Sequence, residues 1–195
     1  MSSSYNPTRR KILKASWQLL EAENPENVRL GDIAKQAGIS RQALYLHFAN
    51  RAELLVETAR FVDQEKGVDA RLEPSRNASS GRERLRHYCA FWTDYLPEIQ
   101  GCARAFLAME HRDEDARIAW ADRMDGLRDG CEAAIKALKN DGELRAGITI
   151  KEASDTLWTL MTFQNWQHLR QTCGWSQERY ANWLIDSAER LLLAD

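Results

Sequence analysis

The chain has 195 residues, of which 44% are hydrophobic and 29% are charged, and its formal net charge is −2. These are ordinary values for a folded globular protein, so the composition argues against a disordered chain. No apolar run approaches the roughly 20 residues that a bilayer-spanning helix needs. The N-terminal sequence MSSSYNPTRRKIL also lacks the apolar segment of a signal peptide. We therefore expect a cytoplasmic protein.

Apolar residues at helical spacing predict an all-α fold of about nine helices. The first helix is expected from Asn6 or Thr8 to about Ala22, and the second from about Leu30 to Ala37. A third helix should begin after Ser40, which is well placed to cap it, and a fourth should span about 50–72. Asn50 followed three residues later by Glu53 is the capping signature of that fourth helix.

The second part of the chain continues the helical pattern. After a polar connector at 73–81 we expect a helix that bends near Pro97 and Gly101, followed by a short helix. A longer helix should run from about Asp113 to residue 140, and another from about 150 to 169. A last helix is predicted from Gln177 to Leu193. The sequence shows no convincing strand and no internal repeat.

The stretch AGISRQALYLHF, residues 37–48, combines a glycine turn with a short helix of two unlike faces. Leu44 and Phe48 are spaced to point inward, which leaves the hydrogen-bonding side chains outward. Two short helices joined by a glycine turn, with a preceding helix to pack on, describe a helix-turn-helix. We interpret the second of them as a helix that lies in a DNA groove.

The charge distribution agrees with this interpretation. Residues 1–51 carry eight Lys or Arg and four Asp or Glu, whereas residues 52–195 carry 19 and 25. A basic head on an acidic body is typical of a nucleic-acid-facing domain joined to another domain. We therefore predict a DNA-binding head at 1–51 and an effector-binding and dimerisation domain at 52–195. The helix at about 50–72 would connect them.

The longer segment DIAKQAGISRQALYLHFANRAELL, residues 32–55, resembles the DNA-binding segment of the tetracycline-repressor (TetR) family. That family's pattern reads roughly I-A-x-x-A-G-V-S-x-G-T-L-Y-x-Y-F-x-S-K-E-E-L-L. The matching residues are Ile33, Ala34, Ala37, Gly38, Ser40, Leu44, Tyr45, Phe48, Glu53, Leu54 and Leu55. Two departures affect which DNA sequence is read. Gln42-Ala43 replaces the frequent Gly-Thr, and Arg29 stands where a threonine often caps the second helix.

The resemblance implies a set of DNA-binding residues, with solvated surface as the alternative interpretation. Arginine suits the two acceptors of guanine and glutamine suits the adenine edge, so Arg41 and Gln42 are the expected base readers. Arg51 is expected to hold a phosphate where the fourth helix begins. The full set is Arg29, Lys35, Ser40, Arg41, Gln42, Ala43, Tyr45, His47 and Arg51.

Six of the seven tryptophans lie beyond residue 80, where they could line a pocket for an apolar effector or simply pack the core. The candidate effector-binding residues are Tyr88, Trp92, Glu110, His111, Trp120, Met124, Trp158, Met161, Gln164 and Asn165. The family resemblance also implies a homodimer held by the last helices. Its candidate interface residues are Trp158, Met161, Tyr180, Trp183, Leu184, Ala188 and Leu191.

No motif for a nucleophile, a phosphate-binding glycine loop or an H-E-x-x-H metal site occurs, so we expect neither an enzyme nor a cofactor or metal. The widely spaced Cys89, Cys102, Cys131 and Cys173 are interpreted as buried free thiols. We predict a ligand-responsive repressor that binds a near-palindromic operator as a homodimer. The alternatives are a small-molecule binding protein or enzyme on this scaffold that has lost DNA binding, and a protein–protein adaptor. The basic head and the intact Tyr45, His47 and Arg51 favour DNA binding.

Overall fold

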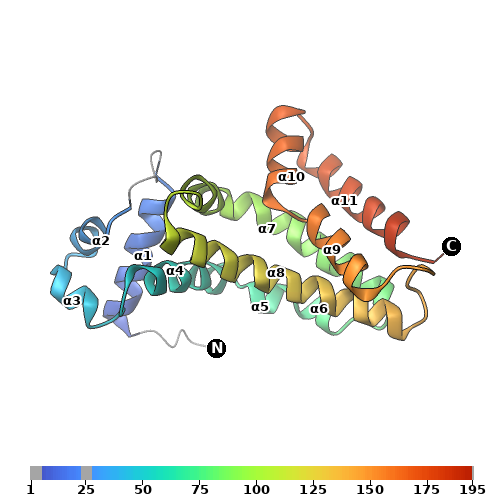
Figure 1. Ribbon diagram of the computed structural model, residues 1–195, viewed down its shortest axis with the longest axis horizontal. Coiled ribbons are helices and arrows are strands. Elements are labelled where there is room, and N and C mark those ends of the chain that lie inside the picture. The colour runs from blue at the N-terminus through green and yellow to red at the C-terminus, as the bar shows by residue number, and fades with distance from the viewer. Residues whose placement is uncertain (1–5, 23–27, 195) are drawn as a thin grey trace. The chain divides into compact units, whose positions relative to one another are not determined.

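The computed structural model describes residues 6–22 and 28–194, so the first five residues of the N-terminal segment lie outside the described part (Figure 1). The predicted all-α class is confirmed: the described residues form helices and contain no β-strand. They include a single isolated antiparallel bridge between Leu144 and Leu193.

The chain forms two compact units. The first comprises Met1–Val68 and Ile99–Met124, and the second comprises Asp69–Glu98 and Asp125–Asp195. Two long helices, α7 (Gly81–Met109) and α8 (Glu114–Asn140), contribute residues to both units. The grouping differs from the boundary predicted at residues 51 and 52, because the segment after Arg51 belongs with the head.

The first unit contains α1 (Pro7–Leu20), α2 (Leu30–Gln36), α3 (Arg41–Tyr45) and α4 (Arg51–Glu65). Side chains cap three of these helices as their sequences predict: Asn6 accepts from the Arg9 amide at 2.8 Å, and Asn50 accepts from the Glu53 amide at 2.8 Å. Ser40 caps α3 in the same way. Such caps satisfy backbone N–H groups that have no partner within the helix.

One apolar core joins these four helices. Helix α1 packs on α2 and α4, and α2 packs on α3. The completely buried side chains include Ile12, Leu13, Leu20, Ile33, Leu44, Leu54 and Leu55. Because α2 and α3 are too short to be stable alone, their conformation depends on this shared core.

The fourth helix is shorter than predicted. It ends at Glu65 with Lys66 as its C-cap, and Gly67 follows in the left-handed region with φ of 67°. A glycine there ends a helix without the steric penalty that a Cβ would bring. Two single-turn helices follow instead, α5 (Val68–Arg71) and α6 (Glu73–Arg76). The expectation of one continuous helix over about 50–72 is therefore wrong.

Helix α7 continues through Pro97 to Met109, so the separate short helix predicted after this position is part of α7. An interior proline costs a helix roughly 3 kcal/mol. Burial on both sides outweighs that cost here, because Tyr95 and Leu96 before the proline and Cys102 and Ala103 after it are all at most 5% exposed. Within the second unit, the start of α7 also lies close to α8. A Cβ added to Gly81 would sit 2.5 Å from the Leu138 amide nitrogen.

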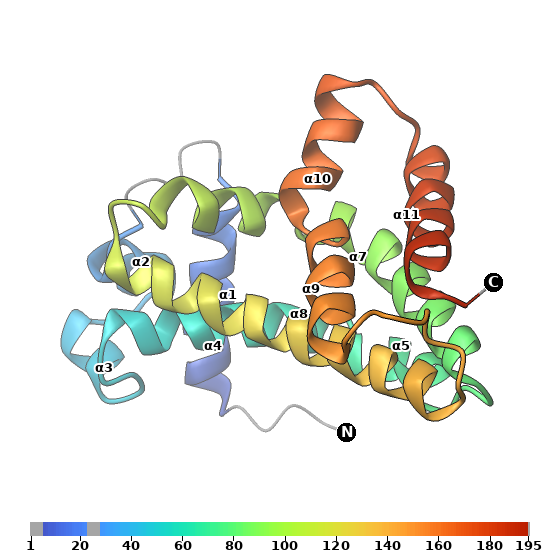
Figure 2. The same cartoon turned by 45° about the vertical axis from the view of Figure 1, so that its right-hand side comes forward.

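The predicted helix at about 150–169 is divided, giving more and shorter segments than expected. The divided region contains α9 (Ile150–Leu160), α10 (Phe163–Gln167) and a π-helical segment, η2 (His168–Thr172). Side chains take up carbonyls that the break releases: the Trp92 indole N–H donates to the Met161 carbonyl, and Asn165 Nδ2 donates to the Thr159 carbonyl at 2.6 Å. Helix α11 (Gln177–Leu192) follows and forms a hairpin with α10 and η2 (Figures 1 and 2).

A buried polar pair between α1 and α4 offers a test of this packing. Thr58 Oγ1 lies 2.9 Å from Ser16 Oγ and 2.7 Å from the Leu54 carbonyl oxygen, and both residues are fully buried. Thr58→Val should lower the free energy of unfolding by about 1–3 kcal/mol, because the Ser16 hydroxyl loses its partner. Urea unfolding measures the change. The double variant Ser16→Ala/Thr58→Val should be more stable than Thr58→Val; equal or lower stability would contradict this interpretation.

Candidate nucleic-acid interface

Helix α3 has the two faces predicted for it. Leu44 is fully buried and Phe48 is 1% exposed, which confirms that they point inward. On the other face Arg41, Gln42 and Tyr45 are exposed, with Tyr45 at 44%. The exposed face of α3 therefore presents a guanidinium, an amide and a phenol, while Leu44 and Phe48 anchor the opposite side in the core.

The turn before α3 sets the direction of this helix. Gly38 adopts φ of 68°, a conformation that residues with a Cβ rarely take. Ser40 Oγ then accepts a hydrogen bond from the Ala43 amide at 3.0 Å. Arg29 is the N-cap of α2 and makes no side-chain cap. Its exposed guanidinium is therefore not committed to capping that helix.

Arg41 and Tyr45 form a pair on the exposed face. Arg41 Nη2 lies 3.3 Å from the Tyr45 hydroxyl, and the guanidinium carbon lies 5.8 Å from the ring centroid. The two residues are one helical turn apart, which is the spacing at which side chains meet. The contact orients both groups before any partner binds.

Arg9 of α1 fixes the end of the helix-turn-helix and was not singled out from the sequence. Its Nη1 donates to the His47 carbonyl at 2.6 Å, and its guanidinium carbon lies 4.2 Å from the Phe48 ring centroid. Ion pairs with Glu53 and Glu57, at 3.6 and 3.4 Å, hold the guanidinium in place. No sequence motif marks this role, because its partners come from distant helices.

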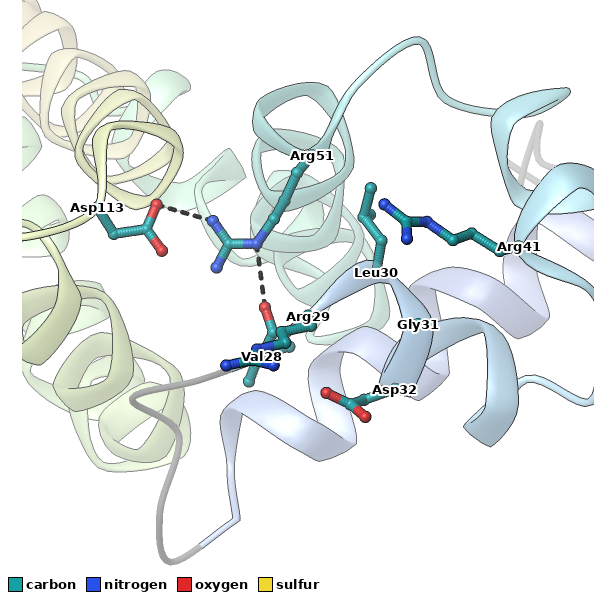
Figure 3. A pocket seen from close by; sticks show the side chains of 8 residues that line it. All are labelled: Val28, Arg29, Leu30, Gly31, Asp32, Arg41, Arg51 and Asp113. Atoms are coloured by element: carbon teal, nitrogen blue, oxygen red, sulfur yellow. Dashed lines mark hydrogen bonds and ion pairs between the residues drawn. The ribbon is translucent and has the colours of Figure 1, made fainter.

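Arg51 joins three segments of the first unit (Figure 3). Its Nε donates to the Val28 carbonyl at 3.0 Å, and its Nη1 donates to Asp113 at 2.7 Å and lies 3.4 Å from Asp115. The Arg51 side chain is 16% exposed. Sequence reasoning expected a phosphate contact, and it placed Asp113 only at the start of a helix. The geometry shows a guanidinium engaged with protein groups that link α4 to the start of α8.

The contact with Arg51 stabilises the ionised form of Asp113. Burial acts to raise its pKa, but the hydrogen bonds from Arg51 and the Ala116 amide, together with the Arg51 charge, lower the pKa below its usual value. Asp113 thus stays ionised at neutral pH, and the ion pair persists there.

A surface hollow of about 480 Å³ lies at the same place. Figure 3 shows the residues that line it, which are Val28, Arg29, Leu30, Gly31, Asp32, Arg41, Arg51 and Asp113. Three arginines face two carboxylates, so the hollow carries an excess of positive charge. Lys35, on the last turn of α2, is exposed as well. Cations on this short hairpin suit a polyanionic partner.

The candidate effector residues fall in both units. In the second unit Trp92 and Tyr88 are 6% and 7% exposed, and Met161 is fully buried. Tyr88 donates to the Leu127 carbonyl at 2.9 Å, and the Met161 sulfur lies 3.9 Å from that of Cys131. Gln164 is exposed. The buried Tyr88, Trp92 and Met161 form one cluster with Cys131, and the hydroxyl of Tyr88 and the indole N–H of Trp92 are its polar groups.

Trp158 and Asn165, both half-buried, also lie in the second unit, whereas the remaining four candidates lie in the first. Trp120 is 8% exposed and stacks on Phe106 with ring centroids 6.3 Å apart. Met124 is half-buried, whereas His111 is exposed, with 86% of its side chain accessible beside Glu110. Within the part of the chain that the structure describes, no group of His, Cys, Asp or Glu is arranged to hold a metal ion.

Burial changes the interpretation of the predicted dimer stripe. Met161, Tyr180, Leu184 and Ala188 are all 0% exposed within a single chain. They pack the protomer's own core, so these four candidate interface residues cannot contact a partner unless that core opens. Leu191 is 42% exposed, and Trp158 and Trp183 are half-buried. A periodicity of apolar residues does not distinguish a core face from an interface.

Two buried polar groups in the second unit could not be anticipated from the sequence. The Tyr180 hydroxyl and Trp158 Nε1 have no hydrogen-bond partner among the described residues. Burial raises the pKa of Tyr180, so it stays a neutral donor. Cys89, Cys102 and Cys131 are buried as expected, and burial raises the pKa of Cys89 to about 12, but Cys173 is exposed.

Comparison with known proteins defines the class of the chain. The sequence model of the family described as bacterial regulatory proteins, tetR family, matches residues 12–58. The HTH-type transcriptional regulator BetI of Agrobacterium fabrum is 32% identical over 136 residues, 68% of this chain and 66% of that protein. The nucleoid occlusion factor SlmA of a Marinomonas species is 34% identical over 85 residues, 37% of this chain. The chain thus spans 43% of SlmA and just under two thirds of BetI.

Solved structures share this fold over nearly the whole chain. A structure described as a TetR-family transcriptional regulator from Rhodococcus sp. superposes with a TM-score of 0.75 at 22% identity, covering 95% of this chain and 99% of that one. The family match at residues 12–58 covers the helix-turn-helix, and the remaining helices share the fold of that structure. The chain belongs to the TetR family. None of its described helices is long and apolar enough to cross a membrane.

The Arg51–Asp113 contact predicts a pH-dependent stability. The pKa of Asp113 is lower in the folded state than in the unfolded state. Its ionised form therefore stabilises the fold at pH values above the unfolded-state pKa of about 3.9, and this stabilisation is lost as the pH falls through the folded-state pKa. Asp113→Asn should therefore destabilise the protein by about 1 kcal/mol at neutral pH, and the difference should shrink in acid. Urea unfolding at pH 7 and pH 2.5 tests this. Asp115→Asn, farther from Arg51, should have the smaller effect; the reverse order would contradict the assignment.

Proposed function

We propose that this regulator is a ligand-responsive repressor that binds a near-palindromic operator as a homodimer. The observation that carries the proposal is the exposed face of α3. Arg41, Gln42 and Tyr45 lie outward on a helix anchored by Leu44 and Phe48. A helix of this size fits the major groove, where guanine and adenine present acceptors and donors that arginine and glutamine recognise.

Contacts to the sugar-phosphate backbone of the DNA would come from the cations around the surface hollow. Arg29 and Lys35 are exposed, and their charges suit the phosphates that flank a recognition helix. Arg51 has a different part in this proposal, because its guanidinium is engaged with Asp113 and Val28. Arg51 orders the α2–α3 hairpin, which carries the other DNA contacts. A phosphate that contacts Arg51 would share its guanidinium with Asp113.

Dimerisation would supply the second recognition helix. The proposed interface uses the side of α11 that the single chain leaves accessible, where Trp183 and Leu191 are eight residues apart on one face. Trp158 of α9 is the other half-buried residue among the interface candidates predicted from the sequence. A two-fold dimer places two copies of α3 against half-sites about one DNA turn apart, which is why the operator should be near-palindromic.

The proposed effector is a small apolar or aromatic molecule with one or two polar groups. Support comes from the buried cluster of Tyr88, Trp92 and Met161 in the second unit. The unpartnered Tyr180 hydroxyl adds a donor that an effector's polar group would satisfy. A ligand that enters such a cluster moves packed side chains, and it shifts the protein between states only by its differential affinity for them.

Ion pairs along α4 and α8 provide a path from effector to DNA. Within the first unit three pairs link the two helices: Arg51 with Asp113 at 2.7 Å, Arg60 with Asp122 at 2.6 Å, and Asp63 with Arg123 at 2.7 Å. Helix α8 continues past Met124 into the second unit. A displacement of α8 would therefore reach α4 and the head through charged contacts at both ends of α4.

The first experiment is a gel-shift assay on the DNA upstream of the protein's own gene. Binding should weaken steeply between about 50 and 200 mM salt, because phosphate neutralisation releases counterions. A footprint should show two protected half-sites about 10 base pairs apart, or a multiple of that spacing. Absence of sequence-specific binding, both there and in selection from random DNA, would favour the alternative of a small-molecule binding protein that has lost DNA binding.

Base reading by α3 can be tested with a matched pair of glutamines. Gln42→Ala should relax the preference at one base pair of each half-site by about 1–3 kcal/mol, because a bidentate contact to adenine is lost. Gln36→Ala, which removes another exposed glutamine, from α2, should leave the preference unchanged. Selection from a random DNA library by each variant measures both. An unchanged preference for Gln42→Ala would show that Gln42 does not read the operator.

The effector proposal predicts a coupled signal. Aromatic compounds that bind should quench tryptophan fluorescence and release DNA over the same range of concentration. Trp92→Phe should reduce the quenching, whereas Trp17→Phe, in α1 of the head, should retain it. Quenching without DNA release would separate binding from regulation. If only polar metabolites released DNA, the apolar character assigned to the site would be wrong.

A further inference from the structure

The largest exposed apolar group of the helix-turn-helix is Leu46, which the sequence pattern did not assign to the DNA-binding set. It is 86% exposed, about twice as much as each of the other exposed large hydrophobic side chains among the described residues. Those are Tyr45 at 44%, Leu191 at 42% and Ile118 at 39%. Two of these four side chains are thus adjacent at the end of α3.

The backbone at Leu46 forms a hydrogen-bonded turn. Leu46 is the C-cap of α3 with φ of −72° and ψ of −17°, and its amide donates to the Ala43 carbonyl at 3.2 Å. The neighbours on either side are fixed too, because Leu44 is buried and the His47 carbonyl accepts from Arg9. The exposed side chain therefore projects from an ordered turn rather than from a flexible loop.

The surroundings of Leu46 select the kind of partner. Arg41 lies on the same short helix and contacts Tyr45. Two further exposed cations are Arg29, the N-cap of α2, and Lys35, on that helix. An apolar protein surface would have to bury these charges without compensation. A DNA groove presents phosphates to the cations, and one apolar group at the base edges, the C5-methyl of thymine.

We propose that Leu46 reads a thymine in each half-site by packing its methyl groups against the thymine C5-methyl. The inference rests on the proposed DNA-binding function and assigns a specificity determinant to it. Arg41 and Gln42 read donors and acceptors, and Leu46 adds an apolar contact at the other end of the helix. Discrimination comes from the methyl group, the only C5 substituent that distinguishes thymine from uracil.

The test removes that methyl group from the DNA. Once an operator has been selected, each thymine of one half-site is replaced in turn by deoxyuridine. At one position the replacement should weaken wild-type binding by about fourfold, the factor that burying one methyl-sized group contributes. Leu46→Ala should bind the unmodified operator more weakly and should lose this sensitivity, whereas Leu46→Met should keep most of it.

Two controls make the result specific. Ile118→Ala, at an exposed apolar residue of α8, should retain the full response to deoxyuridine. Because Leu46 is so exposed, Leu46→Ala should unfold at the wild-type temperature. The inference is overturned if no thymine is sensitive, or if wild type and Leu46→Ala respond equally at every thymine. Specific binding in either case leaves the proposed function intact, whereas absence of specific binding overturns both.

Discussion

A five-residue helix cannot hold its conformation in water, so everything that α3 does depends on what is packed behind it. Leu44 and Phe48 supply that anchor by burial in the core that α1 and α4 complete. Arg9 then covers the Phe48 ring and ties down the His47 carbonyl. Arg41, Gln42 and Tyr45 on the other face stay exposed and are not part of this core.

The helix-turn-helix was readable from the sequence because its signals are local. The spacing of Leu44 and Phe48, the turn at Gly38 and the caps at Ser40 and Asn50 each depend on residues a few positions apart. The second face of α3 followed from the same spacing. What the pattern did not indicate was how far Leu46 stands out, because exposure at a helix end is decided by the segments that pack nearby.

Features that depend on distant residues were missed or misassigned. The partner of Arg51 is Asp113, 62 positions away, and no local pattern connects them. Tyr180, Leu184 and Ala188 have the periodicity of a buried helix face. Periodicity shows only that a face is covered, and not whether the same chain or a partner covers it. The continuity of α7 through Pro97 and the break after α9 likewise reflect tertiary packing that outweighs local preference.

The membership of α4 in the first unit has a consequence for recombination between regulators of this class. Its Leu54, Leu55 and Thr58 complete the core on which α1 rests, so a chimera joined at residue 51 would exchange the residues that α4 contributes to that core. A junction near Gly67, where the chain turns between α4 and α5, would transfer the helices of the head intact. Such a chimera would still need compatible charges at positions 113, 122 and 123, because the recipient's α8 has to meet Arg51, Arg60 and Asp63. The head is thus transferable only together with a matching stretch of α8.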